Sequence, residues 1–185
     1  MVTDSPNRRP SGPSLYHEEQ RPRQWWIWVV VLAVAGLTWW TFIRQVALGE
    51  PVGEVPLPTW VAWLLFLLIG VGLPLVTLSL RLVLEVTTEQ VTIRFAPITR
   101  RVIPVAEIEA VEARTYDPIK EYGGWGIKGW SRRKMAYNMS GNRGVELTLR
   151  DGRQVMLGSQ RADELARAVE RQRTAQHAGT RGSSS

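Results

Sequence analysis

The sequence predicts an α+β membrane protein, in which two transmembrane helices precede an antiparallel β domain that ends in a helix. Three observations carry this prediction. Two apolar blocks, Trp25–Ile43 and Trp60–Leu80, contain no Lys, Arg, Asp or Glu. From Arg81 onward apolar residues alternate with polar ones, which is typical of strands with one buried face. Over 162–169 the apolar residues return to the spacing of an amphipathic helix.

Each apolar block is about 20 residues long, which is enough for a helix to cross the hydrocarbon core of a bilayer. Tryptophans stand at both ends of the first block and open the second, where indole rings favour the level of the lipid headgroups. A core helix of a soluble protein would normally carry a polar stripe. We therefore expect transmembrane helices at 25–43 and 60–80. Because neither holds an ionisable residue, they are expected to be an anchor and not a transport pathway.

The distribution of arginine predicts the orientation, because cytoplasmic segments close to membrane spans are rich in Lys and Arg. Arginines lie within residues 1–24 and directly after the second block, whereas the connection over 44–59 holds Arg44 against Glu50 and Glu54. We expect residues 1–24 to be a disordered cytoplasmic tail and 44–59 an external loop. Both termini of this multi-pass protein would then be cytoplasmic, and the arginine-rich composition favours a bacterial inner membrane.

Short runs with an apolar residue at every second position predict the strands of the β domain. They cover 81–87, 91–95, 101–103, 108–116, 145–149 and 154–157. Asp151-Gly152 between the last two runs predicts a hairpin with a type I′ turn, which needs positive φ at both central residues. Ser159 is expected to cap the final helix. The polar segment 174–185 is expected to be disordered.

Three stretches of the β domain resemble bacterial pleckstrin-homology-like (PH-like) domains. They are LEVTTEQVTI at 84–93, RRVIPVAEIEAVE at 100–112 and DGRQVMLGSQRADELA at 151–166. The resemblance covers 81–173 and implies a cytoplasmic PH-like domain, built as a bent, partly closed antiparallel barrel or sandwich with a C-terminal helix over one open end. Such domains often follow one or two membrane spans. The insertion at 117–142 departs from the minimal pattern of the family.

The insertion at 117–142 holds the candidate interaction site, because it combines glycines, aromatic residues and a basic run. The candidate residues are Tyr122, Gly123, Gly124, Trp125, Gly126, Lys128, Trp130, Arg132, Arg133, Lys134 and Tyr137. In a purely structural alternative, the aromatic residues plug an end of the barrel and Met135–Met139 supplies a strand. In a second alternative, the tryptophans enter the membrane interface and 132–134 meets anionic headgroups. In a third, the segment binds a protein partner, since aromatic residues and Arg anchor interfaces.

The sequence favours a binding module over an enzyme. It holds no Cys and only two His, which excludes thiolate sites and disfavours imidazole metal sites and His-based catalysis. We expect no catalytic residue, no cofactor and no metal. The leading hypothesis is a non-enzymatic, membrane-anchored PH-like module that mediates protein–protein or lipid-surface interactions at the cytoplasmic face. The alternative is an accessory or assembly subunit of a larger membrane enzyme or transport complex. The expected partners are the lipid bilayer, anionic phospholipid headgroups or a membrane protein complex, and not a nucleic acid.

Overall fold

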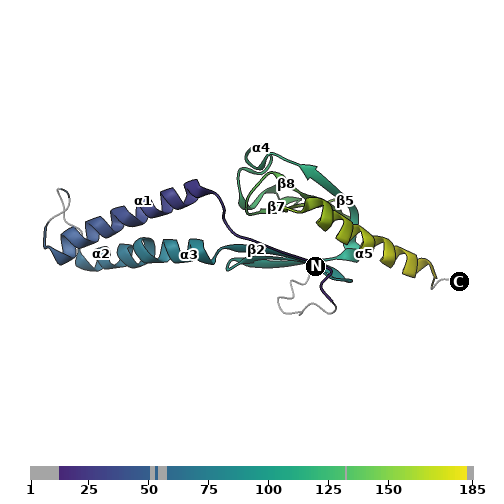
Figure 1. Cartoon of the computed structure of the whole chain (residues 1–185), viewed down its shortest axis with the longest axis horizontal. Helices are drawn as coiled ribbons and strands as arrows, with labels where there is room; N and C mark the ends of the chain where they lie inside the picture. The colour runs from purple at the N-terminus through teal and green to yellow at the C-terminus, as the bar shows by residue number, and fades with distance from the viewer. Residues whose placement is uncertain (1–12, 51–52, 54–57, 132, 183–185) are drawn as a thin grey trace. The chain divides into compact units, whose positions relative to one another are not determined.

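The computed structural model describes residues 13–50, 53, 58–131 and 133–182 (Figure 1). The chain forms two compact units. Pro22–Leu80 make up a helical unit, and a β unit combines Met1–Arg21 with Arg81–Ser185. The segment that precedes the helices therefore belongs to the same unit as the segment that follows them.

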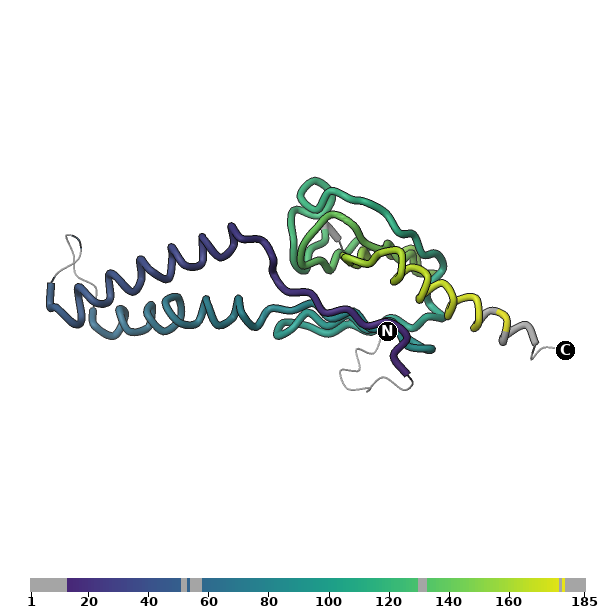
Figure 2. Tube along the Cα trace, viewed as in Figure 1, coloured from purple at the N-terminus to yellow at the C-terminus, as the bar shows by residue number. Residues whose placement is uncertain are grey.

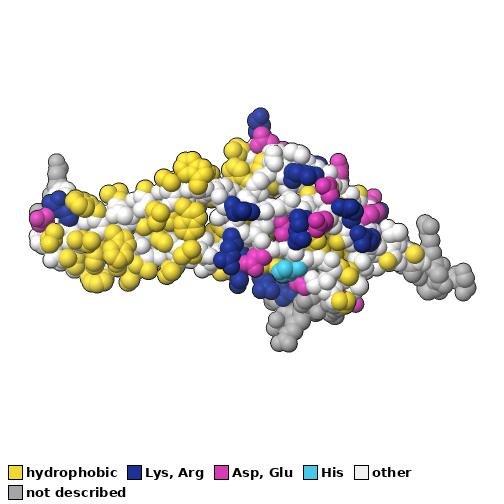
Figure 3. Space-filling view, in the orientation of Figure 1, with side chains coloured by type: hydrophobic (Ala, Val, Ile, Leu, Met, Phe, Trp, Pro, Cys, Tyr) yellow, Lys and Arg dark blue, Asp and Glu magenta, His cyan; other side chains and the backbone are white. Residues whose placement is uncertain are grey.

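Two long helical segments form the helical unit, as the sequence predicts (Figure 2). The first consists of α1 (Trp25–Phe42) and a π-helical end, η1 (Ile43–Ala47). The second consists of α2 (Thr59–Leu65), a π-helical stretch, η2 (Phe66–Gly72), and α3 (Leu73–Ser79). Both are long and apolar enough to cross a membrane. Most of their large side chains are exposed, as the hydrophobic surface in Figure 3 shows.

The two helical segments pack through aromatic side chains and one hydrogen bond. Phe42 stacks on Phe66 with ring centroids 4.2 Å apart, and Trp39 meets the edge of Phe66 at 4.8 Å. Pro74 has no N–H, so it cannot donate the usual helical bond to the carbonyl of Gly70. The indole Nε1–H of Trp39 donates to that carbonyl at 3.1 Å instead. The contact thus satisfies a backbone acceptor that proline leaves open.

The β unit contains two sheets and a C-terminal helix. Sheet A has the order β1-β2-β3-β4 and is antiparallel throughout. Its strands are β1 (Tyr16–Gln20), β2 (Arg81–Val86), β3 (Gln90–Ala96) and β4 (Thr99–Pro104). Sheet B has the order β5-β8-β9-β7-β6, with β7 and β9 parallel. Its strands are β5 (Ile108–Thr115), β6 (Gly126–Ser131), β7 (Lys134–Asn138), β8 (Arg143–Leu149) and β9 (Gln154–Gly158). The remaining elements are a 3-10 turn, η3 (Val105–Glu107), and the helices α4 (Pro118–Tyr122) and α5 (Ala162–Gly182).

The alternating pattern of the sequence accounts for the core of the β unit. Leu82, Leu84 and Val86 on β2 are fully buried, and their neighbours in the sequence point to the other face. Leu165 and Val169 on α5 are also fully buried, so the helix covers the sheets with its apolar stripe. The strands predicted over 81–116 and 145–157 are confirmed as β2 to β5, β8 and β9.

Four details differ from the sequence-based expectations. Of the expected barrel or sandwich, the described residues form two separate sheets that do not close into a barrel, and the parallel pair of β7 and β9 departs from the expected antiparallel arrangement. Part of the predicted disordered tail 1–24 is the edge strand β1. Within 174–185, α5 continues to Gly182. The hairpin turn is not type I′: only Gly152 has positive φ (79°), and its N–H donates to the carbonyl of Leu149 at 2.8 Å.

Candidate functional site

The predicted insertion at 117–142 is folded into sheet B. It contributes α4 and the hairpin of β6 and β7, and β7 coincides closely with the strand expected at Met135–Met139. Asp117 caps α4, with its Oδ1 accepting from the N–H groups of Ile119 and Lys120 at 3.0 and 3.1 Å. Gly123 ends the helix in the left-handed conformation, with φ 77°. The glycines of the insertion are therefore explained in part by its turns.

Two of the candidate interaction residues belong to the core of the β unit. Tyr122 and Tyr137 are 3% and 5% exposed, so neither ring can meet a partner without unfolding its surroundings. The ring of Tyr122 packs edge-on against Tyr116 at 5.8 Å between centroids. Lys134 places its Nζ 5.2 Å from the centre of the Tyr122 ring. Burial raises the pKa of Tyr122 to about 12. These contacts favour the structural interpretation for this part of the insertion.

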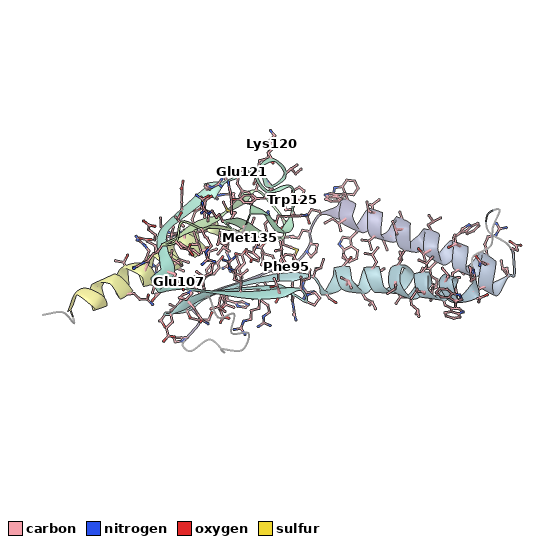
Figure 4. All side chains as sticks on the ribbon, turned by 180° about the vertical axis from the view of Figure 1, so that it is seen from behind. Phe95, Glu107, Lys120, Glu121, Trp125 and Met135 are labelled. Carbon is pink, nitrogen blue, oxygen red and sulfur yellow. The ribbon has the colours of Figure 1, made fainter. Side chains whose placement is uncertain are left out.

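Arg114 on β5 joins the insertion to sheet B through two carboxylates. Its Nη2 lies 2.8 Å from Oε2 of Glu121 on α4 and 2.6 Å from Oε2 of Glu146 on β8. The hydrogen bond from Arg114 lowers the pKa of Glu121, and the same bond raises the pKa of Arg114. Lys120, Glu121 and Trp125 lie at the α4 end of the unit (Figure 4). The ion pairs fix α4 against the sheet and leave Lys120 exposed.

A buried amide holds the start of β6. Asn138 is fully buried, and its Nδ2 donates to the hydroxyl of Tyr116 at 3.0 Å. Its Oδ1 accepts from the N–H of Gly126 at 2.8 Å. Gly126 has φ 108°, a conformation that side chains with a Cβ rarely adopt. The hairpin therefore requires glycine at position 126. The preceding turn requires glycine at 123 and 124 for the same reason, since both have positive φ.

The residues of the insertion that can meet a partner lie along its outer edge. Lys128 and Arg133 are exposed, and Trp125 is half-buried with its indole N–H donating to the carbonyl of Gly141 at 3.1 Å. A shallow groove of about 520 Å³ lies beside Trp125 and is lined in part by Ile119. Arg132 and the side chain of Trp130 lie outside the described residues. β6 is also the last strand of sheet B, so one side of its backbone is not paired within the sheet.

A second cluster, which the sequence did not reveal, joins β1 to the start of α5. The carboxylate of Glu18 is 5% exposed and accepts from the hydroxyls of Tyr16 and Ser159, both at 2.5 Å. It also accepts from the N–H of Gln160 at 2.9 Å. Burial and the bond to Glu18 raise the pKa of Tyr16. Ser159, predicted to cap the final helix, lies in the turn before α5, where its Oγ accepts from the N–H of Arg161 at 3.0 Å.

Three arginines share one face of sheet A, at the end where β2 begins. Arg81 and Arg94 are exposed, and Arg100 lies directly opposite Arg94 on the neighbouring strand. The common face of these residues depends on the register of the sheet. Within the described part of the chain, no three His, Asp or Glu side chains are grouped so that they could hold a metal ion.

Comparison with known protein families identifies a matching family. The model of a family of unknown function, DUF6141, matches residues 7–175, which span both units of the structure. A search of curated proteins finds no match.

Proposed function

The chain belongs to the DUF6141 family of unknown function, and we propose that it is a non-enzymatic, membrane-anchored module with a PH-like domain. In this proposal the apolar helices cross a bacterial inner membrane as a hairpin. The β unit lies at the cytoplasmic face and binds a partner there.

The observation that carries the proposal is the pairing of β1 with β2. Gln20 at the end of β1 lies opposite Leu82 near the start of β2, although the whole helical unit separates them in the chain. Only 21–24 connects β1 to α1, and only Leu80 connects α3 to β2. Two strands in hydrogen-bonding contact must lie on one side of a membrane. The pairing therefore supports an even number of crossings and a β unit held directly at the bilayer surface.

The charges next to the helices support the cytoplasmic side. Arg21, Arg23 and Arg81 flank the helices at the end that carries the β unit. At the other end Arg44 is paired with Glu50 at 2.5 Å, so the connection contributes little positive charge. The positive-inside rule places the arginine-rich side in the cytoplasm.

The PH-like assignment and the binding role rest on the β unit itself. Its strands, all antiparallel except for the pair of β7 and β9, are followed by α5, whose apolar stripe covers the sheets. A helix after the strands is the order of elements that the resemblance implies. The outer edge of the insertion offers Trp125, Lys128 and Arg133 for binding, since aromatic and basic side chains anchor many interfaces. We infer that this edge and the basic face of sheet A are the surfaces through which the module acts.

Topology is tested first, with single cysteines in a chain that has none of its own. Glu50→Cys places a thiol in the connection between the helices, and Asp151→Cys places one in the turn between β8 and β9. A membrane-impermeant maleimide added to intact cells is expected to label the first variant only, and to label both after lysis. Labelling of Asp151→Cys in intact cells would overturn the cytoplasmic placement.

The binding role is tested by photo-crosslinking of the full chain in native membranes, with the probe at Lys128 and a control probe at the exposed Arg150. The proposal predicts specific products from Lys128 that the Arg150 probe does not give. A single protein that is crosslinked and co-purifies in equal amount would identify the alternative, an accessory subunit of a larger membrane complex. Absence of any product specific to Lys128 would remove the insertion edge from the proposal.

A further inference from the structure

We propose that one end of sheet A binds anionic phospholipid headgroups, through Arg81, Arg94 and Arg100, with the side chain of Ile98 entering the interfacial region of the bilayer. We call this surface the basic end of sheet A. The inference rests on the proposed function, because it requires the helices to lie in a bilayer. It gives a specific ligand and a specific surface to a part of the chain that the sequence-based candidate site does not include.

The register of sheet A brings the three arginines to one face. Arg94 lies opposite Val83 on one neighbouring strand and opposite Arg100 on the other. Arg81 is two residues before Val83 on β2, so it projects from the same face as Arg94. The opposite face carries the buried Leu82 and Phe95. Arg81 and Arg94 are therefore held outward by the burial of their neighbours Leu82 and Phe95.

The basic end is also the end at which the chain leaves the sheet for the helices. Arg81 follows Leu80 directly, and Arg81 lies opposite Ala96, where β3 ends. The turn between β3 and β4 therefore lies level with the first residue of β2. If the helices are in a bilayer, covalent connection keeps this end of the sheet close to the headgroups. No long linker separates the arginines from the lipid surface.

Two of the arginines, Arg81 and Arg94, lack the internal neutralisation that other charges of the protein have. Among the described residues, Arg81 and Arg94 have no carboxylate within ion-pair distance, whereas Arg114, Arg143 and Arg153 each do. Like charges directly opposite each other on neighbouring strands destabilise a sheet. The pair of Arg94 and Arg100 has this arrangement. An anionic phosphate outside the sheet relieves the repulsion, which is a physical reason for a ligand at this place.

An exposed apolar side chain accompanies the arginines. Ile98 is 63% exposed at the turn between β3 and β4, and it follows the exposed Pro97. Exposure of a large aliphatic side chain to water at a turn is energetically unfavourable. Beside basic residues it suits the boundary between headgroups and acyl chains. The combination favours a lipid surface over a free phosphate or an acidic peptide, which would need no such side chain.

The charge falls away along the sheet, which makes the basic end distinct from the rest of the face. Beyond the row of Glu19, Val83, Arg94 and Arg100, the outward positions hold neither Lys nor Arg. They are His17, Glu85, Thr92, Val102, Gln90 and Pro104. A general basic coat for solubility would not be graded in this way. The gradient matches a surface that meets the bilayer at one end and solvent at the other.

The experiment measures docking of the full chain in lipid nanodiscs with an environment-sensitive fluorophore on Ile98→Cys. Quenching by brominated acyl chains is compared between discs of phosphatidylcholine alone and discs that also contain phosphatidylglycerol. We expect quenching to rise with phosphatidylglycerol and to fall at high salt. Arg81→Gln/Arg94→Gln is expected to lower the ratio of docked to undocked protein about fivefold for each arginine, and about thirtyfold for the pair.

Two matched controls separate docking from general charge effects. Arg150→Gln/Arg171→Gln removes the same charge from exposed positions in the β8–β9 turn and on α5, and it is expected to leave quenching unchanged. A fluorophore on Thr88→Cys reports from the opposite end of sheet A and is expected to show no response to phosphatidylglycerol.

Each of three quenching results would overturn the inference: equal quenching in both lipid mixtures, full quenching after loss of both arginines, or equal effects of the two double variants. A protein crosslinked to Arg94 in place of lipid would do the same and would identify a protein ligand for this surface. The cysteine-labelling test of topology is independent of these outcomes. If labelling supports the hairpin and quenching does not respond to lipid, only the lipid ligand fails.

Discussion

Replacement of Glu18 by alanine should detach β1 from α5 and destabilise the β unit by about 3 kcal/mol. The carboxylate is buried and accepts three hydrogen bonds, from Tyr16, Ser159 and the N–H of Gln160. Hydrogen bonds to charged groups contribute about 1.5–3 kcal/mol each. The net loss of stability is smaller than the sum of three such bonds, because the alanine variant has no carboxylate to remove from water on folding. In addition, the hydroxyls of Tyr16 and Ser159 lie 3.2 Å apart and can hydrogen-bond to each other.

The assay is pulse proteolysis of the full chain in detergent over a series of urea concentrations, which measures the unfolded fraction of the β unit. Glu19→Ala is the matched control on the same strand. Glu19 points to the opposite, exposed face and pairs with Arg21 at 3.2 Å, so its loss should change the free energy of unfolding by less than about 0.5 kcal/mol. Glu18→Gln should lie between the two variants, at about 1 kcal/mol, because one oxygen acceptor remains. Equal stabilities of Glu18→Ala and Glu19→Ala would refute the reasoning.

Three further predictions concern other contacts. Arg114 lowers the pKa of Glu121, so the ion pair should stabilise the fold fully above the pKa that Glu121 has in the unfolded state, and this stability should be lost as pH falls through the folded-state pKa. Glu121→Gln should therefore reduce the fall of the urea midpoint at acidic pH. An unchanged fall would contradict this. Gly158→Ala should lower the free energy of unfolding by about 2 kcal/mol, because the added Cβ would lie 2.6 Å from Cβ of Asn138. A urea midpoint equal to that of the wild type would contradict this and would show that Asn138 moves aside. Trp39→Phe should weaken the helical hairpin by about 1 kcal/mol through loss of its indole donor, measured by titration with a denaturing detergent, whereas exchange of an exposed tryptophan should have no effect.

Much of the β unit could be predicted, because the local sequence of most strands shows which positions are buried. In β2 and β3 apolar residues occupy the inward positions, so the alternation is visible without knowledge of the partner strand. β1 has the same geometry, but its inward positions include Glu18 and Gln20. Their burial depends on contacts with residues 158–160, far along the chain. The local sequence of β1 gives no sign of these distant partners, so β1 is indistinguishable from a polar tail.

The candidate site could be predicted only in part for a related reason. Composition marked the insertion as unusual, yet it could not separate Tyr122, which is buried, from Trp125, which is half-buried. The cap of α4 was readable from Asp117-Pro118 and the following Gly123, and it would have indicated a short helix. The basic end of sheet A requires the register of β2, β3 and β4, which places Arg94 beside Arg100. Sequence order alone does not give that register.

The pairing of β1 with β2 also has a consequence for biogenesis. The first strand of the domain is synthesised before the helices, and its partner strand only after them. β1 therefore cannot pair until both helical segments and β2 have been made. A chain with one helix inserted and the other left behind would hold the two strands on opposite sides of the membrane. If the helices cross the membrane as proposed, completion of sheet A depends on insertion of both helices, and a misinserted chain would leave the carboxylate of Glu18 and the edge of β2 uncovered.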